Sequence, residues 1–172
     1  MKIFLITTAA IFHLSCMVSA GKVDPFHETP REYAARAQWL RDAKIGVFVH
    51  WNPSSIIAQE ISWSRKDYGT NKYDQLYKQF KGEKFNADDW VKLFYDSGIR
   101  YAVIVSKHHD GFSMFDTKVP VCSEYSVMKA PFGRDYVKEI SDACHRDGVK
   151  FCLYSRFWIG GIRTTARRQA QT

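Results

Sequence analysis

Cysteine is scarce in this sequence and shows no regular spacing. Four cysteines occur among 172 residues, and Cys16 lies in the apolar N-terminal stretch, which leaves Cys122, Cys144 and Cys152. An odd number of irregularly spaced cysteines excludes the disulfide framework that is typical of small exported domains. The sequence also contains no CxxC pair and no HExxH motif, so neither a zinc ribbon nor a zincin-type metalloenzyme is predicted.

The sequence also lacks an apolar run long enough to cross a membrane, which needs about 20 residues. Its most apolar stretch, residues 3–12, follows a lysine, is ended by His13 and leads through small residues to Gly21. These features are typical of a secretory signal peptide, with a membrane anchor as the alternative. We predict that residues 1–20 are a signal peptide and that the protein is secreted, periplasmic or lysosomal.

Acidic residues are missing from both ends of the chain, which explains most of its net charge of +7. Residues 1–20 contain one lysine and residues 156–172 contain four arginines, with no acidic residue in either stretch. Without these cations, residues 21–155 carry a net charge of +2, which is ordinary for a solvated surface. Nucleic-acid binding usually requires a basic stripe, and the body of the chain has none. We therefore expect neither nucleic acid nor a membrane as a partner.

One pattern occurs three times along the chain: a helical stretch, a short turn and an apolar run. The three predicted pairs are residues 31–42 with 45–51, residues 87–97 with 101–106, and residues 134–146 with 149–154. Asn86 is a helix-capping residue, and Gly98 and Gly148 stand where helix-terminating glycines are common. Each apolar run is therefore predicted to be a strand that follows a helix.

Apolar strands that alternate with amphipathic helices indicate an α/β fold, in which helices cover parallel strands. In the second helix, Trp90, Leu93 and Phe94 are spaced to form the buried face. A complete (β/α)8 barrel typically needs about 250 residues, more than this chain has. The predicted fold is therefore a partial TIM-like barrel, truncated to about the first three β/α units.

Polar and aromatic residues concentrate where the predicted strands end. They are His50 after the first strand, Glu60 and Trp63 in the following loop, His108, His109 and Asp110 after the second strand, and Tyr154 at the end of the third. Since the carboxyl ends of parallel barrel strands meet at one rim, we expect these side chains to form one pocket. Imidazole and carboxylate groups bind sugar hydroxyls and aromatic rings stack on a sugar's apolar face, so the pocket suits a carbohydrate.

Each of these residues has an ordinary structural explanation as well. A histidine at a strand end can be a satisfied core residue, and a tryptophan such as Trp63 usually packs. The pair His108 and His109 can be a solvated turn, because neighbouring strand residues face opposite ways. A zinc or iron site formed by His50 with residues 108–110 is a further alternative, although adjacent histidines rarely both reach one ion. We predict no metal and no cofactor.

The most distinctive segment of the chain is Lys107-His108-His109-Asp110-Gly111-Phe112. Further characteristic segments are residues 44–51 (KIGVFVHW), 59–65 (QEISWSR), 73–80, 85–94, 134–135 and 151–154. In this order, over roughly residues 31–155, they resemble glycoside hydrolase family 29, the alpha-L-fucosidases. The HHDG segment alone would be a weak signal, whereas the ordered set is specific.

The resemblance implies a (β/α)8-like catalytic barrel followed by a β-sandwich, and removal of terminal alpha-linked L-fucose with retention of configuration and without a metal. The implied partner is a fucosylated glycan or glycoconjugate, and the motifs specify no oligomeric state. By motif match, the residues at the sugar are His50, Glu60, Trp63, His108, His109 and Tyr154. The histidines would hold fucose hydroxyls, Glu60 would also be an acid/base candidate, and the two aromatic residues would line the pocket.

Retaining hydrolysis requires a carboxylate nucleophile and a second carboxyl group about 5–5.5 Å away. In the family the nucleophile is an aspartate on a later strand, and neither Asp110 nor Asp116 matches it. Asp110 is expected to fix its turn or to orient an imidazole. The chain as written is therefore expected to bind sugar and to be inactive as a fragment. The alternatives are a non-catalytic fucose-binding remnant and a metal-dependent barrel hydrolase.

The resemblance ends after Tyr154, where the family continues with a segment like ILDW. Residues 156–165 can be encoded so that a shifted frame of the same bases reads ILDWRHPDY, and the single codon of Trp158 forces the aspartate. We predict three regions: a signal peptide over 1–20, the N-terminal part of a glycoside hydrolase barrel over 21–155, and an aberrant tail over 156–172 produced by a frameshift. An unrelated natural C-terminus is the alternative.

Overall fold

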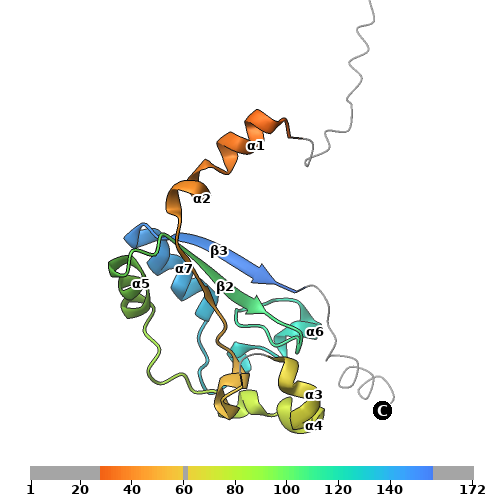
Figure 1. The fold of residues 1–172 in the computed structure, drawn as a ribbon. Helices are drawn as coiled ribbons and strands as arrows, with labels where there is room; N and C mark the ends of the chain where they lie inside the picture. Colours follow the sequence, from red (N-terminus) through yellow and green to blue (C-terminus); the bar gives the residue numbers. More distant parts are fainter. Residues whose placement is uncertain (1–27, 60–61, 157–172) are drawn as a thin grey trace, which may run out of the picture. The chain divides into compact units, whose positions relative to one another are not determined.

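The computed structural model describes residues 28–59 and 62–156 (Figure 1). The predicted signal peptide and residues 157–172 of the predicted tail lie outside these ranges, so both stay predictions. The chain divides into two compact units, residues 1–38 and 39–172. Within the described part, no helix has the length and apolar character needed to cross a membrane.

The described residues form short helices, 3₁₀ turns and a small sheet. In chain order the elements are α1 (Pro30–Arg36), α2 (Gln38–Ala43), β1 (Gly46–Val49), η1 (Pro53–Ile57), η2 (Ser62–Ser64), α3 (Arg65–Tyr68), α4 (Thr70–Tyr73), η3 (Leu76–Gln79), α5 (Ala87–Asp96), β2 (Tyr101–Lys107), α6 (Pro120–Ser123), η4 (Val127–Lys129), α7 (Tyr136–Asp147) and β3 (Lys150–Ser155). The single helix predicted over residues 31–42 is wrong, because α1 ends at Arg36, Ala37 is its C-cap, and α2 begins at Gln38. No glycine or proline marks this break in the sequence.

The sheet is parallel, in the order β1-β2-β3. Gly46 pairs with Tyr101, which pairs in turn with Lys150, so the three strands begin in register. Helices α5 and α7 lie side by side on the same side of this sheet (Figure 1). The prediction of an α/β fold with parallel strands and alternating helices is confirmed.

Local capping explains the bounds of the two long helices. The side chain of Asn86 accepts hydrogen bonds from the N–H groups of Asp88 and Asp89 at the start of α5. Asp135 accepts one from the N–H of Lys138 at the start of α7. Gly148 ends α7 with a φ of 72°, in the left-handed region where glycine carries no steric penalty. The roles of Asn86 and Gly148 agree with the predictions, whereas α7 begins two residues after the predicted start at Arg134.

The core lies between the sheet and the helices α5 and α7. Its fully buried members include Val91, Ala102, Ile104, Phe112, Met114, Val127, Tyr136, Ile140, Ala143 and Cys144. In α5, Ala87, Val91 and Phe94 share the buried face. Leu93 is 63% exposed, so its predicted burial is wrong: the i, i+4, i+7 row that begins at Ala87 faces the sheet and turns Leu93 away from it.

Strand β2 contains a bulge. Val105 pairs with Tyr154, but Lys107 pairs with Ser155, so Ser106 is one extra residue on β2. The Ser106 hydroxyl donates to the backbone carbonyl of Tyr154 at 3.1 Å, and the Ser106 carbonyl accepts from the N–H of Met114 at 2.8 Å. Because side chains alternate along a strand, one extra residue reverses the alternation for every residue that follows.

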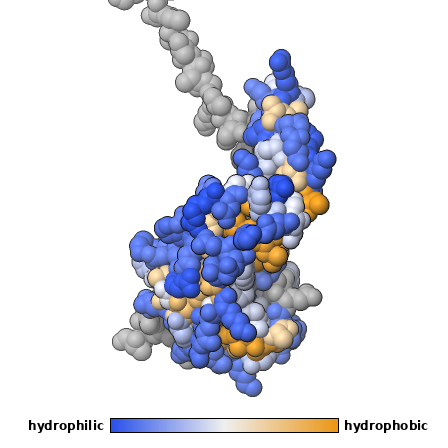
Figure 2. Space-filling model, turned by 90° about the vertical axis from the view of Figure 1, so that its left-hand side faces the viewer, coloured by the Kyte–Doolittle hydropathy of each residue, from blue (hydrophilic) through white to orange (hydrophobic). Residues whose placement is uncertain are grey.

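Parts of the sheet are not covered by the described residues. Phe48, in the middle of β1, is 51% exposed, and Leu153 in β3 is 53% exposed. Elsewhere the surface is of the usual mixed kind: on the face in Figure 2, hydrophilic side chains predominate and hydrophobic ones occur in small groups. Two large apolar side chains of the three-stranded sheet are therefore not covered by the described residues.

We expect the change Gly82→Ala to lower the free energy of unfolding by about 2–3 kcal/mol, because two costs add. Gly82 has a φ of 58°, and an added Cβ would lie 2.5 Å from the ring of Phe132 and 2.9 Å from that of Trp51. The matched control is Gly98→Ala, at a φ of 79° with no atom within 4 Å of the new Cβ, which should cost about 1 kcal/mol. Urea denaturation measures both, and equal costs would contradict the packing argument.

Candidate functional site

Rings from the ends of the three strands meet at one place. His50 follows β1, His108 and His109 follow β2, and Tyr154 lies in β3. The ring centroid of His108 is 5.5 Å from that of His50, 4.5 Å from that of His109 and 5.9 Å from that of Tyr154. The carboxyl ends of the parallel strands thus bring these four predicted residues together.

The bulge in β2 explains why His108 faces this cluster. Val105 pairs with Tyr154 and shares its face of the sheet. Strict alternation would send His108 to the opposite, helix-covered face. Ser106, as the extra residue, reverses the alternation and returns His108 to the face of Tyr154. His108 is only 4% exposed, which excludes a solvated turn at this position.

His50 lies against Phe48. The two rings stack with their centroids 4.9 Å apart and their planes 16° apart, and Phe48 is 5.8 Å from Tyr154. Phe48 and His50 are two residues apart in the chain, so they project from the same face of β1. The cluster of imidazoles therefore has an aromatic neighbour on its own face of the sheet.

Ser62 contacts His108 from a loop 46 residues away in the sequence. Its Oγ lies 2.6 Å from Nδ1 of His108 and accepts a hydrogen bond from the N–H of Asp110 at 3.3 Å. Ser62 is 3% exposed and begins η2. Ser62 was not predicted from the sequence, because a serine in a polar loop carries no signal of its own.

Asp110 holds the turn that follows β2. It is 1% exposed; its Oδ1 accepts from the N–H of Phe112 and its Oδ2 accepts from the hydroxyl of Tyr73, both at 3.0 Å. Burial raises the pKa of this carboxyl to about 6, although the bonds from Phe112 and Tyr73 and the charge of Arg65 act in the opposite direction. Of the two roles expected for Asp110, the structure supports fixing the turn, since no bond to an imidazole is found among the described residues.

His109 contacts two further groups. The ring of Trp63 lies 4.2 Å from that of His109 and is inclined by 51°, while Trp63 itself is 65% exposed. On the other side, Nη1 of Arg156 lies 2.6 Å from Nε2 of His109. A guanidinium group only donates, so Nε2 of His109 is the acceptor. Trp63 thus belongs to the same cluster, as expected.

Asp116 is not part of this cluster. Glu60 lies outside the described residues, so its predicted role at the sugar stays a prediction. Asp116 is at the surface, where it pairs with Lys118 at 2.6 Å. No group of three or more histidine, cysteine, aspartate or glutamate side chains is placed to hold a metal ion in the described part of the chain.

The lowered pKa values of the three histidines favour neutral imidazoles at neutral pH. Burial lowers the pKa of His50 and, together with the charge of Arg156, that of His109. The pKa of His108 falls to about 4, through burial first and then through His109, His50 and Arg156. A neutral imidazole offers one donor and one acceptor, which matches the chemistry of a sugar hydroxyl.

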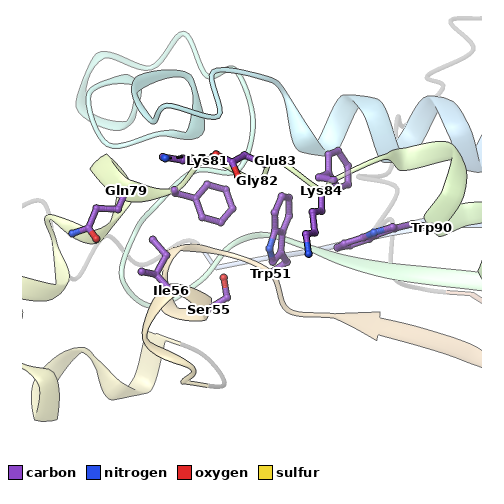
Figure 3. Close-up of a pocket in the computed structure, with 11 residues that line it drawn as sticks. Trp51, Ser55, Ile56, Gln79, Lys81, Gly82, Glu83, Lys84 and Trp90 are labelled. Atoms are coloured by element: carbon purple, nitrogen blue, oxygen red, sulfur yellow. Dashed lines mark ion pairs between the residues drawn. The ribbon is translucent and has the colours of Figure 1, made fainter.

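A separate pocket of about 480 Å³ lies around Trp51 (Figure 3). Its lining comes from the loop after β1, from the segment before α5 and from α5 itself, and includes Ser55, Ile56, Phe80, Lys84, Phe85 and Trp90. The Trp51 ring packs within 5.6 Å of five aromatic rings, so its first role is structural. None of the predicted sugar-binding residues that the structure describes lines this pocket.

Comparison with known proteins agrees with this geometry. The sequence profile of the family described as Alpha-L-fucosidase matches residues 14–158. The plasma alpha-L-fucosidase of Homo sapiens is 31% identical over 161 residues, which cover 79% of this chain and 32% of that protein. A putative alpha-L-fucosidase of Caenorhabditis elegans is 33% identical over 135 residues, which cover 67% of this chain and 27% of that protein. The chain thus spans about a third of the length of these relatives.

Solved structures of alpha-L-fucosidases also resemble this chain. The alpha-L-fucosidase AlfC from Lactobacillus casei, in complex with its alpha-L-fucose product, superposes with a TM-score of 0.62 at 32% identity, over 70% of this chain and 39% of that one. Alpha-L-fucosidase isoenzyme 1 from Paenibacillus thiaminolyticus gives a TM-score of 0.64 at 31% identity, over 70% and 28%. The matching profile, the relatives and these structures show that the chain belongs to the alpha-L-fucosidases, glycoside hydrolase family 29.

Proposed function

We propose that this chain forms the fucose-binding part of an alpha-L-fucosidase that removes terminal alpha-L-fucose from glycoconjugates with retention of configuration. The observation that carries the proposal is the cluster of His50, His108, His109 and Tyr154 at the carboxyl ends of three parallel strands. Neutral imidazoles at such a rim suit a polyhydroxylated ligand. A relative of known structure, AlfC, was solved with alpha-L-fucose bound.

The proposal includes a barrel in which these strands are the first three. The exposed side chains of Phe48 and Leu153 support it, because further β/α units would bury both. The proposal also assigns the nucleophile to a segment outside the described residues. Asp110 is unsuited to that role, since its two carboxylate oxygens are engaged with Phe112 and Tyr73. The signal peptide predicted over residues 1–20 would export such an enzyme to the glycans that it acts on.

The 172-residue chain is expected to be inactive, so the test is an assay of the protein expressed from its native gene, read through the predicted frameshift. We expect hydrolysis of 4-nitrophenyl alpha-L-fucopyranoside, with alpha-L-fucose as the first product in the proton NMR spectrum, and no hydrolysis of the corresponding beta-fucoside. Saturation by free L-fucose without turnover would favour a non-catalytic binding function instead. Hydrolysis with inversion, or no interaction with fucose at all, would contradict the proposal.

A further inference from the structure

His108 has two ring nitrogens with different surroundings. Nδ1 faces the Oγ of Ser62 at 2.6 Å, whereas Nε2 has no hydrogen-bond partner among the described residues. The rings of His50, His109 and Tyr154 surround His108. The state of Nδ1 therefore decides what the other nitrogen offers to a ligand.

The number of protons available at Ser62 favours one of the two states of Nδ1. The hydroxyl has one proton to donate, and its oxygen already accepts from the backbone N–H of Asp110 at 3.3 Å. In one arrangement the Ser62 proton points to Nδ1 of His108, and all three groups are satisfied. In the other, Nδ1–H points to the oxygen, and the buried hydroxyl proton is left without an acceptor among the described residues. A buried polar group without a partner is unfavourable, so the first arrangement is adopted.

We infer that Ser62 is a positioning residue that fixes His108 as the Nε2–H tautomer, so that the ring donates a hydrogen bond to a hydroxyl oxygen of the sugar. The naming of the sugar rests on the proposed function, whereas the tautomer rests on the contacts of Ser62 alone. The low pKa of His108 agrees with this assignment, because a neutral ring has a single N–H to place.

Two other histidines have the opposite assignment and serve as internal references. Nδ1 of His145 lies 2.6 Å from the backbone carbonyl of Ser141, which only accepts, so Nδ1 of His145 bears a proton. Nε2 of His109 accepts from Arg156, so the neutral ring of His109 also carries its proton on Nδ1. The neighbouring rings of His108 and His109 are therefore in different tautomers.

The functional consequence concerns one hydrogen bond. A sugar hydroxyl both donates and accepts, and a neutral histidine that presented a bare Nε2 would accept instead of donating. Because Ser62 keeps the proton of His108 on Nε2, His108 donates a hydrogen bond to the oxygen of the sugar hydroxyl. The proton of that sugar hydroxyl then remains available for another acceptor. A residue that never touches the sugar thus sets the direction of a contact to it.

The experiment is a long-range proton–nitrogen NMR spectrum of the 15N-labelled protein at about pH 7, followed by titration with free L-fucose. In the wild type we expect His108 in the Nε2–H form and His145 in the Nδ1–H form. The change Ser62→Ala should shift His108 to a mixture of tautomers and weaken fucose binding about 10-fold, the order expected for one misdirected hydrogen bond. Ser62→Thr, which keeps the hydroxyl, should restore both to near wild type.

The tautomer of His108 and the proposed function are tested by different results. An Nδ1–H form of His108 in the wild type, or a tautomer that does not respond to Ser62→Ala, would overturn the inference even if fucose binds normally. An Nε2–H form in a protein that does not bind fucose would overturn the proposed function and leave the tautomer assignment intact. The wild-type spectrum decides the tautomer by itself, so a poorly folded variant does not remove the test.

Discussion

Replacing His108 by asparagine is expected to lower kcat/KM for an aryl alpha-L-fucoside by about 30- to 1000-fold. The variant can still accept from Ser62 at the position of Nδ1, but it has no atom at the position of Nε2. It therefore loses the contact to the sugar while the loop contact is kept. Loss of one or two hydrogen bonds in a desolvated site is worth about 2–4 kcal/mol, which corresponds to that range.

Two further variants show whether the loss of Nε2 of His108 is responsible for the lower kcat/KM. His108→Gln places an amide N–H near the position of Nε2, so it should retain more activity than His108→Asn. His145→Gln changes an exposed histidine on α7 whose ring contacts the backbone of Ser141, and it should leave kcat/KM unchanged. If the asparagine variant keeps wild-type activity, His108 does not contact the sugar.

The largest loss of stability is expected for Asp110→Ala, at about 4 kcal/mol. The change removes the acceptor of both the Tyr73 hydroxyl and the Phe112 N–H in a position that is 1% exposed. It leaves a cavity and two buried donors without partners. Asp110→Asn is the matched control: its oxygen can accept from Phe112 and its amide can donate to the Tyr73 oxygen, so we expect a loss of about 1 kcal/mol. Chemical denaturation at about pH 7 measures both.

We also expect the free energy of unfolding to depend on pH through Asp110. The pKa of Asp110 is raised from 3.8 to about 6, so its contribution to stability is fully present below 3.8 and is lost as the pH rises through 6. The pKa of His108 is lowered from 6.5 to about 4, so its contribution is present above 6.5 and is lost as the pH falls through 4. Between these limits the two contributions oppose each other.

Asp110→Asn removes one of the two opposing contributions. We therefore expect the stability of this variant to rise with pH between about 4 and 6.5 more steeply than that of the wild type, by about 3 kcal/mol over the interval. Denaturation midpoints of both proteins across this interval give the difference. Parallel curves would show that Asp110 titrates at its ordinary pKa in the folded protein.

Much of the fold could be predicted because its signals are local. Asn86 caps α5, and Gly148 ends α7, and each acts within one helical turn of its own position. The parallel arrangement followed from helices that alternate with apolar strands. Leu93 was misplaced because two helical rows were compatible with the apolar residues of α5, and only contact with the sheet selects between them.

The site could be predicted as a set of residues, but not as a geometry. The sequence placed His50, His108 and Tyr154 at strand ends, and the structure brings their rings together. It gave no sign of the extra residue Ser106 in β2, which decides the face on which His108 lies. It also gave no sign of Ser62, since a contact across 46 residues depends on the path of a whole loop.

The order of the strands has a consequence for synthesis on the ribosome. Each strand pairs with the one made just before it, so β2 can add to β1, and β3 to β2, in the order in which they emerge. Chains are made at about 5–20 residues per second, which leaves seconds between successive strands for each helix and strand to settle. At every stage both outer edges of the sheet are unpaired, and the next strand adds to the edge of the strand made last. The pairing of these three strands can therefore follow the order in which they are synthesised.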